Sequence, residues 1–209
     1  MSGVLILGAG GHAKVIADIL FCQGTVVQGF LDDDPELWGE TRLGLPVLGA
    51  INQCFKYEPD GLIIGIGNNL VRQHIAELLT PQAQSLWCNA IHPQATIAGS
   101  AQLGRGIVVG AKAVINPDSV LGHHVVINTA ATVDHDCTIN DFAHVAPGVN
   151  LGGEVFVGEG AFLGIGSSLI PGIRIGDWAK IGAGSVVVRD LPSGSVAFGI
   201  PAKPRATTS

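Results

Sequence analysis

Aliphatic residues recur at every sixth position through the second half of the chain, from Ile91 to Val187. Every one of these positions holds Ile, Leu or Val, and no insertion breaks the register. The fifth residue of each hexad is small or β-branched, and the second is often Gly. A hexapeptide repeat of this kind predicts a parallel β-helix, whose coils stack on their neighbours. We expect positions one and five to point inward and the polar residues to lie outside.

The composition suits a thin, regular core, because 47% of the residues are hydrophobic, only 5% are aromatic and 30 are Gly. The net charge of −6 argues against a nucleic-acid partner, which would need a basic face. No stretch is long and apolar enough to predict a membrane span. The four cysteines lack the spacing of a zinc site or a disulfide framework, and the N-terminus does not resemble a signal peptide. A reduced, cytoplasmic protein is therefore expected.

The first half alternates between patterns typical of strands and helices. Buried strands are predicted at residues 4–8, 25–34 and 60–69, and amphipathic helices at 13–24 and 70–79. This order predicts a small parallel α/β sheet. We therefore expect a Rossmann-like domain over residues 1–90 and a β-helix domain with a C-terminal tail over residues 91–209.

The predicted sheet carries candidate ligand-binding residues beyond the carboxyl ends of its strands, where ligands of such sheets bind. Glycines at the start of the first helix would let backbone N–H groups approach a phosphate, and an Asp after the second strand could accept from a ribose or a base. The candidates are Gly10, Gly11, His12, Asp32, Asp33, Gly67 and Asn68. Ala13 replaces the third glycine of the dinucleotide fingerprint. A tight packing turn and a solvated pair of acids therefore remain alternatives.

The stretch "TVDHDCTINDFAHVAPG", residues 132–148, places polar residues within the aliphatic repeat. His135 holds position three of its hexad and His144 holds position six of the next, so both should point outward. Cys137 holds position five and should fill the core. From the repeat alone, an outward histidine could equally pack at an interface or act as a catalyst.

Several motifs give the chain a resemblance to a known family. They are "GAGGHAK" at residues 8–14, "FLDD" at 30–33, "IGIGNN" at 64–69, "INTAATVDHDC" at 127–137, "FAHVAPG" at 142–148 and "GIPAKP" at 199–204. With them the chain resembles sugar acyltransferases of the sialic acid O-acetyltransferase type. It resembles even more closely the UDP-amino-sugar N-acetyltransferases of bacillosamine synthesis. The resemblance implies a left-handed β-helix, a homotrimer, acetyl-CoA between neighbouring prisms, a sugar nucleotide on the first domain and no metal.

The resemblance also implies roles for individual residues. His135 would be the general base, and Asp136 would raise its basicity. His144, Ile165 and Ala183 would contact acetyl-CoA, and the candidates of the first domain would bind the sugar nucleotide. A base in the tail, Lys203, could neutralise the CoA 3′-phosphate, although tail bases are usually solvated.

Elementary chemistry supports these roles independently. Acyl transfer from a thioester needs a base on the attacking amine or hydroxyl, and histidine suits that task because its pKa is near neutrality. A neighbouring carboxylate raises that pKa. The tetrahedral oxyanion needs a donor, commonly a backbone N–H. Gly153 lies one predicted coil beyond His135 and is our candidate for that donor. The resemblance implies acetylation of the amine, or a hydroxyl, of a nucleotide-linked sugar, with a UDP-4-amino-4,6-dideoxy-N-acetyl sugar as the expected acceptor, whereas the residues alone do not distinguish UDP from GDP, dTDP or CMP.

Other functions remain open. A sialic acid O-acetyltransferase would use the same base. A metal hydratase of the γ-carbonic anhydrase type would need three zinc-binding histidines, and the chain lacks their H-x-x-x-x-H spacing. A dinucleotide oxidoreductase is disfavoured by the incomplete glycine fingerprint. A non-catalytic scaffold would leave the polar stretch unexplained.

Overall fold

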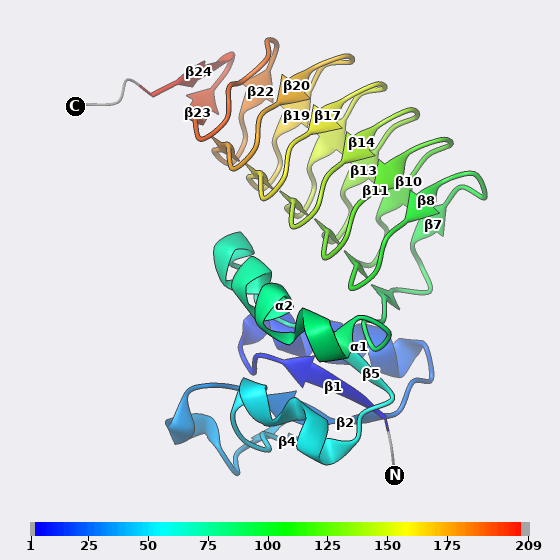
Figure 1. Cartoon of the computed structure of the whole chain (residues 1–209). Helices are drawn as coiled ribbons and strands as arrows, with labels where there is room; N and C mark the ends of the chain where they lie inside the picture. Colours follow the sequence, from blue (N-terminus) through cyan, green and yellow to red (C-terminus); the bar gives the residue numbers. More distant parts are fainter. Residues whose placement is uncertain (1–2, 206–209) are drawn as a thin grey trace. The chain divides into compact units, whose positions relative to one another are not determined.

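The computed structural model describes residues 3–205 (Figure 1). The ends of the two expected domains, residues 1–2 and 206–209, lie outside the described residues. The chain divides into two compact units. The first runs to Pro93 and includes Arg105–Val108, and the second comprises Gln94–Gly104 and the chain from Val109 onward.

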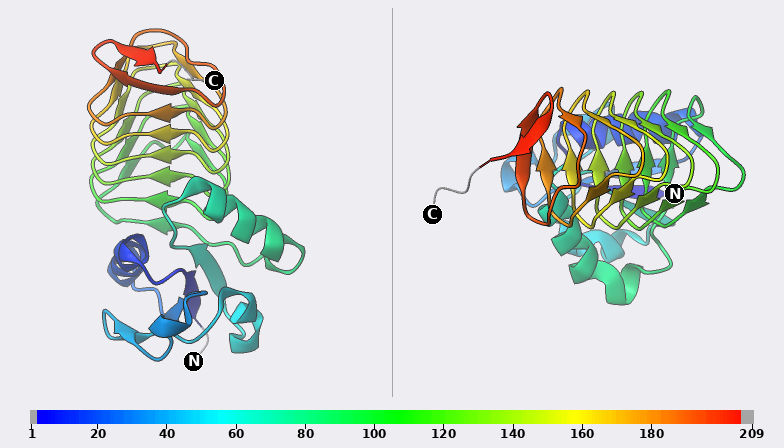
Figure 2. Two further views of the ribbon diagram at one scale, coloured as in Figure 1. Left: turned by 90° about the vertical axis from the view of Figure 1, so that its left-hand side faces the viewer. Right: turned by 90° about the horizontal axis from the view of Figure 1, so that it is seen from above.

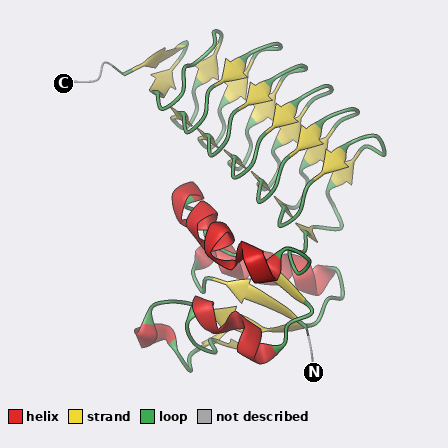
Figure 3. Ribbon diagram, viewed as in Figure 1, coloured by secondary structure: helices red, strands yellow, loops and turns green. Residues whose placement is uncertain are grey.

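The first unit contains a 3-stranded parallel sheet in the order β2-β1-β5. Helices flank this sheet, and the β-helix unit is built of strands and turns (Figure 3). The elements of the first unit are β1 (Val4–Leu7), α1 (Gly11–Cys22), β2 (Val27–Leu31), η1 (Pro35–Leu37), β3 (Thr41–Arg42), β4 (Leu45–Pro46), η2 (Ile51–Tyr57), β5 (Gly61–Ile64), α2 (Asn69–Ala83) and β6 (Ala90–Ile91). The predicted alternation of strands and helices is thus confirmed.

Two strands end earlier than predicted, because side-chain oxygens accept backbone N–H groups just beyond them. The strand expected at residues 25–34 shortens to β2, because Asp32 turns the chain by accepting the N–H of Asp34 at 3.0 Å. The strand expected at 60–69 shortens to β5, since Asn68 caps α2 by accepting the Val71 N–H at 3.2 Å. No helix within residues 3–205 is long and apolar enough to cross a membrane.

Ala13 packs against the sheet at the point where a dinucleotide-binding turn normally has its third glycine. The space comes from the opposite side, because Gly65 follows β5 directly beneath the helix. A Cβ on Gly65 would lie 2.7 Å from the Cβ of Ala13 and 2.8 Å from Cγ2 of Ile6. The close approach of helix and strand is therefore present even though the glycine pattern is incomplete.

The second unit is a parallel β-helix with three sheets (Figure 2). Each short strand holds positions six and one of a hexad and pairs with the strand three hexads further on, as in Thr132↔Asn150 and Val133↔Leu151. One sheet contains β7 (Thr96–Ile97), β10 (Val114–Ile115), β13 (Thr132–Val133), β16 (Asn150–Leu151), β19 (Ser168–Leu169) and β22 (Val186–Val187). The next contains β8 (Gln102–Leu103), β11 (Val120–Leu121), β14 (Thr138–Ile139), β17 (Phe156–Val157) and β20 (Arg174–Ile175). The third includes β9 (Val108–Val109), β12 (Val126–Ile127), β15 (His144–Val145), β18 (Phe162–Leu163), β21 (Lys180–Ile181), β23 (Val196–Gly199) and β24 (Ala202–Pro204).

The core of the β-helix follows the hexad positions. Position one is buried, as at Val133 and Ile139, and position five is buried with it, as at Cys137, all three at 0% exposure. The fourth position turns the corner, and it adopts the left-handed conformation in residues other than glycine, including Asp118 (φ 61°) and Asp136 (φ 58°). The prediction of a β-helix with this inward pattern is confirmed.

The Ala13–Gly65 contact yields a prediction about stability. Gly65→Ala should destabilise the first unit by about 1–3 kcal/mol, because the added methyl group would overlap the Ala13 side chain and backbone. Gly67→Ala is the matched control, since a Cβ there meets nothing within 4 Å. Thermal unfolding followed by circular dichroism measures both. Equal Tm values for the two variants would contradict the proposed close contact.

Candidate active site

His135 and Asp136 lie on the exposed turn between β13 and β14. Nδ1 of His135 is 2.7 Å from Oδ2 of Asp136, and the two side chains are 54% and 56% exposed. Because a carboxylate accepts hydrogen bonds, it fixes the proton of the neutral imidazole on Nδ1. The other ring nitrogen, Nε2, is then unprotonated and can take a proton from a substrate.

Electrostatics make this histidine a stronger base than usual. The pKa of His135 is raised above its ordinary value, chiefly by the hydrogen bond to Asp136. Partial desolvation opposes the shift, and the negative charges of Asp134, Asp136 and Glu154 add to it. The predicted pairing of a histidine with an adjacent carboxylate is therefore present in the geometry.

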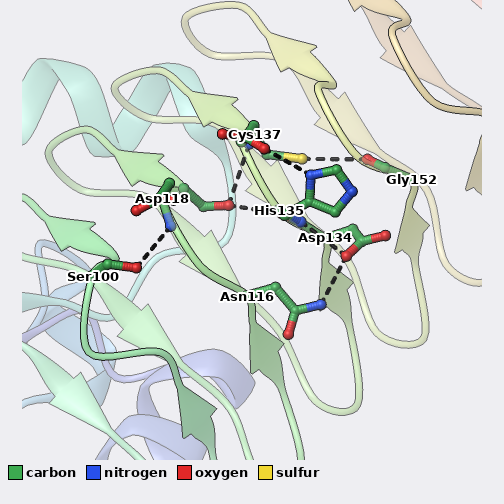
Figure 4. A network of polar contacts seen from close by, with 9 residues as sticks. Ser100, Asn116, Asp118, Asp134, His135, Cys137 and Gly152 are labelled. Atoms are coloured by element: carbon green, nitrogen blue, oxygen red, sulfur yellow. Dashed lines mark hydrogen bonds and ion pairs between the residues drawn. The ribbon is translucent and has the colours of Figure 1, made fainter.

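A second carboxylate anchors the same turn (Figure 4). Oδ1 of Asp134 accepts the backbone N–H of His135 at 2.9 Å and the side-chain N–H of Asn116, one coil below, at 2.8 Å. The hydrogen bond from Asn116 is the main reason that the pKa of Asp134 is lowered. Our reading of the sequence missed both residues. Their separation by one full coil, at position two of each hexad, is the signal that could have found them.

Gly153 lies on the next coil, against the imidazole. The N–H of its neighbour Glu154 donates to the carbonyl of His135 at 2.9 Å. A Cβ on Gly153 would lie 2.6 Å from both Cε1 and Nε2 of His135, so a side chain there would push the ring out of its present position. Within residues 3–205 the Gly153 N–H has no hydrogen-bond acceptor. A backbone donor is therefore available beside the basic nitrogen.

His144 points outward as expected, but its neighbours cover it. Its neighbour Val145 fills the core, so His144 points away from the core as position six requires, but only 7% of it is exposed. It packs edge-to-face on Phe162 of the next coil, at 5.2 Å between ring centroids, and its Nε2 lies 3.2 Å from Nδ2 of Asn128. An amide nitrogen only donates, so Nε2 of His144 accepts this bond. The expected outward direction is therefore present, and the side chain is covered by its neighbours on the sheet.

The other residues expected to bind acetyl-CoA lie at a different corner of the prism from His135. Ile165 is 60% exposed after β18, and Ala183 is exposed after β21. The two are on successive coils, because the Gly184 N–H donates to the carbonyl of Ile165 at 2.8 Å. Lys203 is exposed on β24, where it pairs with Phe198 of β23. His135 and Gly153, by contrast, follow β13 and β16 of another sheet.

In the first unit, the glycines at the carboxyl edge of the sheet face open space. A Cβ on Gly10, Gly11 or Gly67 would meet nothing within 4 Å. Gly10 is the N-cap of α1, and Gly11 begins the helix. The first backbone N–H groups of a helix lack partners within the helix and suit an anionic ligand. The edge therefore has room for a phosphate where the sequence predicted one.

The polar side chains of this edge shape its loops. Oδ2 of Asp32 accepts the Ala9 N–H at 2.7 Å, and Oδ1 of Asp33 accepts the Ile51 N–H at 2.9 Å. Asn68 caps α2. These side chains thus have structural roles that the sequence did not assign to them, and their contacts with a nucleotide stay a prediction.

A buried arginine lies behind the Gly67 loop and was missed from the sequence. Arg72 is only 1% exposed, and its guanidinium donates to the carbonyl of Ile66 at 3.2 Å and to Oδ1 of Asn69 at 3.1 Å. Burial lowers the pKa of Arg72 to about 10, so it stays a cation at neutral pH. Burial, together with the charge of Arg72, lowers the pKa of His12 to about 4. His12 is therefore neutral at pH 7.

The β-helix unit thus presents a histidine–carboxylate pair and a backbone donor on adjacent coils, the arrangement that acyl transfer requires. No cluster of three or more His, Cys, Asp or Glu residues that could hold a metal ion is found in residues 3–205. The fold and the site together define a hexapeptide-repeat acyltransferase.

Comparison with known proteins identifies the family. Residues 3–79 match the PglD N-terminal domain, and residues 154–189 match the bacterial transferase hexapeptide (six repeats). A mutant of the GDP-perosamine N-acetyltransferase of Caulobacter crescentus, solved in complex with CoA and GDP-perosamine, is 41% identical with a TM-score of 0.91. That similarity covers 99% of this chain and 98% of the other. The chain therefore belongs to the family of sugar N-acetyltransferases that includes this enzyme, and it is an acyltransferase.

Two further relatives support this assignment. The acetyltransferase domain of PglB from Neisseria gonorrhoeae, solved in complex with acetyl coenzyme A, is 37% identical with a TM-score of 0.89, over 97% of this chain and 98% of the other. The UDP-N-acetylbacillosamine N-acetyltransferase of Bacillus subtilis is 39% identical over 114 residues. That match covers 52% of this chain and 51% of the Bacillus protein, so the chain spans about half the length of this curated relative.

The pairing of His135 with Asp136 yields a pH-dependent prediction. Asp136 raises the pKa of His135, so Asp136→Asn should lower that pKa and move the titration midpoint of the imidazole to lower pH. NMR titration of the His135 ring measures the midpoint directly. Asp118→Asn is the matched control, because Asp118 holds the same left-handed corner position one coil below. A midpoint that moved equally in both variants would refute the specific contribution of Asp136.

Proposed function

We propose that this protein transfers the acetyl group of acetyl-CoA to the amine of a nucleotide-linked amino sugar, with His135 as the general base. The observation that carries the proposal is the His135–Asp136 pair, 2.7 Å apart, with the Gly153 N–H beside the ring. The similarity over nearly the full length to an enzyme solved with CoA and GDP-perosamine supports the choice of both substrates.

The chemistry follows from the geometry of the turn. Nε2 of His135 takes a proton from the sugar amine as the amine nitrogen attacks the thioester carbonyl. The new C–N bond forms, and the carbonyl oxygen becomes an oxyanion that accepts a hydrogen bond from the Gly153 N–H. Collapse of this intermediate breaks the C–S bond, and the proton on His135 passes to the departing sulfur. Asp136 stabilises the imidazolium between these steps.

The acetyl-CoA residues support a homotrimer with a site shared between subunits. His135 and Gly153 lie at one corner of the prism, whereas Ile165 and Ala183 lie at another. A single prism therefore does not bring the base and all the proposed acetyl-CoA residues together. A neighbouring copy that presents its Ile165 corner to the His135 corner would complete the site. The enzyme would work in the cytoplasm, where acetyl-CoA and nucleotide sugars are made.

We propose that the acceptor is a 4-amino sugar. Its nucleotide is open, because one relative is named for a UDP sugar and another for a GDP sugar. The family resemblance implied a UDP sugar, whereas the Caulobacter relative, which is similar over nearly its full length, is named for GDP-perosamine. Parallel assays with GDP-perosamine, a UDP-4-amino sugar and free sialic acid, following the release of CoA thiol, test the assignment. Acetylation of sialic acid alone would replace the proposal with sugar O-acetylation, and no acetylation of any acceptor would contradict the proposed reaction.

His135→Ala should lower kcat by about 10²-fold or more with little change in the KM of the acceptor, because it removes the base and no proposed sugar contact.

His144→Ala should act mainly on the KM of acetyl-CoA. His123→Ala is the control, since His123 holds the same hexad position as His135 and is exposed. Steady-state kinetics measure all three variants. Normal kcat in His135→Ala with its loss in His144→Ala would reverse the two roles.

Gly10→Leu should raise the KM of the sugar nucleotide several-fold and leave the KM of acetyl-CoA nearly unchanged. The added side chain would project into the open space at the start of α1. Gly99→Leu is the matched control, because a Cβ there also meets nothing within 4 Å and Gly99 belongs to the β-helix. A rise in the KM of acetyl-CoA instead would show that the two half-sites are misassigned.

A further inference from the structure

The turn that carries His135 and Asp136 is closed by a side chain and not by a direct backbone bond. In most turns at the other two corners of the prism, the N–H of position five donates directly to the carbonyl of position two. Ala131 donates to Asn128 at 3.1 Å in this way, and Ala143 donates to Asn140 at 3.2 Å. At the corner of His135, the described turns of residues 116–119 and 170–173 lack this direct bond as well.

At residues 134–137 a side chain from the coil below takes the place of that direct bond. The hydroxyl of Ser119 donates to the carbonyl of Asp134 at 2.7 Å and accepts the N–H of Cys137 at 3.2 Å. No direct bond joins the Cys137 N–H to the Asp134 carbonyl in the described chain. One oxygen atom therefore joins the two backbone groups.

The same substitution occurs one coil further along, in the turn that contains Gly153. The thiol of Cys137 donates to the carbonyl of Gly152 at 3.3 Å (Figure 4), and the sulfur receives a hydrogen bond from the N–H of Val155. Among the described residues, no direct bond runs from the Val155 N–H to the Gly152 carbonyl. Two consecutive turns, which carry the proposed base and the proposed oxyanion donor, are thus each bridged from the coil below.

Burial shows that these bridges are specific. Ser119 and Cys137 are both 0% exposed and hold position five, where most hexads have an aliphatic side chain or Ala. A buried hydroxyl is costly unless it is hydrogen-bonded, and Ser119 is bonded on both sides. Ser167 holds the same position and is equally buried, yet its hydroxyl has no hydrogen-bond partner. Position five therefore does not impose such a bridge by itself.

We propose that Ser119 and Cys137 are positioning residues for acetyl transfer, and that they set the shapes of the two turns that meet at the reacting atoms. Ser119 holds the turn that points Asp136 at His135, and Cys137 holds the turn that places the Gly153 N–H beside the ring. The inference rests on the proposed function. Without the Ser119 hydroxyl, the buried Cys137 N–H and the Asp134 carbonyl would lose the oxygen that joins them. The turn would then relax and carry Asp136 away from Nδ1.

An isosteric pair of variants isolates the hydroxyl. Ser119→Val and Ser119→Thr have the same shape, but only Thr keeps the bridge, and position five already accommodates Val125 and Val149. Ser119→Val should lower kcat about tenfold or more with little change in either KM, since small misplacements of reacting groups are costly. The acidic limb of its pH–rate profile should move to lower pH. Ser119→Thr should restore both properties to near wild-type values.

A control variant and a second test variant separate an effect on the positions of the catalytic groups from a general loss of core packing. Ser167→Val makes the same change of side chain at another corner and should leave kcat and the pH profile unchanged, with any effect confined to the KM of acetyl-CoA because its turn carries Ile165. Cys137→Ala should lower kcat without moving the acidic limb, because it releases the Gly153 turn and leaves the Ser119 bridge in place. Circular dichroism and light scattering establish that each variant is folded and has the wild-type oligomeric state. If Ser119→Val does not fold, Cys137→Ala tests the same arrangement.

The outcomes distinguish this inference from the proposed function. Wild-type kcat and pH profile in Ser119→Val, or an equal loss in Ser119→Val and Ser119→Thr, would overturn the role of Ser119. Wild-type kcat in Cys137→Ala would overturn the role of Cys137. In either case a strong loss in His135→Ala would leave the proposed function standing. Full activity in His135→Ala would instead remove the proposed function itself.

Discussion

The backbone hydrogen bonds between successive coils are the constraint on which the second unit depends. A strand such as β13 bonds to the strand one coil before it and to the strand one coil after it, so each side chain lies above one at the same hexad position. This register lets a residue act on another that is distant in sequence. Asn116 reaches Asp134, and Gly153 lies against His135, because each pair is separated by one coil. The proposed active site is therefore made of turns from three successive coils: the coil of Asn116 below, the coil of His135, and the coil of Gly153 above.

The site combines exposure with order. His135 and Asp136 are more than half exposed, as a substrate requires, and an exposed side chain is usually free to change its rotamer. The fixed elements are in the backbone beneath them. Asp134 holds the N–H of His135, and the Glu154 N–H holds its carbonyl, so the turn is tied on both sides while the imidazole stays accessible. The backbone of His135 is thus held in place by hydrogen bonds, while its imidazole stays accessible to solvent.

Much of the fold and part of the site could be predicted from the sequence. The period of six fixed the coil, the inward positions and the place of His135, because hydrophobic spacing reports burial directly. The burial of His144 could not be predicted, since it depends on Phe162 and Asn128 of neighbouring coils. Arg72 was missed because its helix reads as an ordinary amphipathic segment, in which an arginine is expected on the surface. Ser119 fits the rule of a small residue at position five, and only its two hydrogen bonds reveal what it contacts.

The packing of Ala13 on Gly65 has a consequence for how glycine fingerprints are recognised. The distance between a helix and a strand depends on two residues together, and here the missing side chain is on the strand. A motif that scores one loop position by position counts Ala13 as a defect, although the residue that makes room for the Ala13 methyl group is the glycine at position 65 of the strand side. In a set of related sequences, the constraint would therefore emerge as covariation between positions 13 and 65, with one of the two kept small whenever the other gains a methyl group.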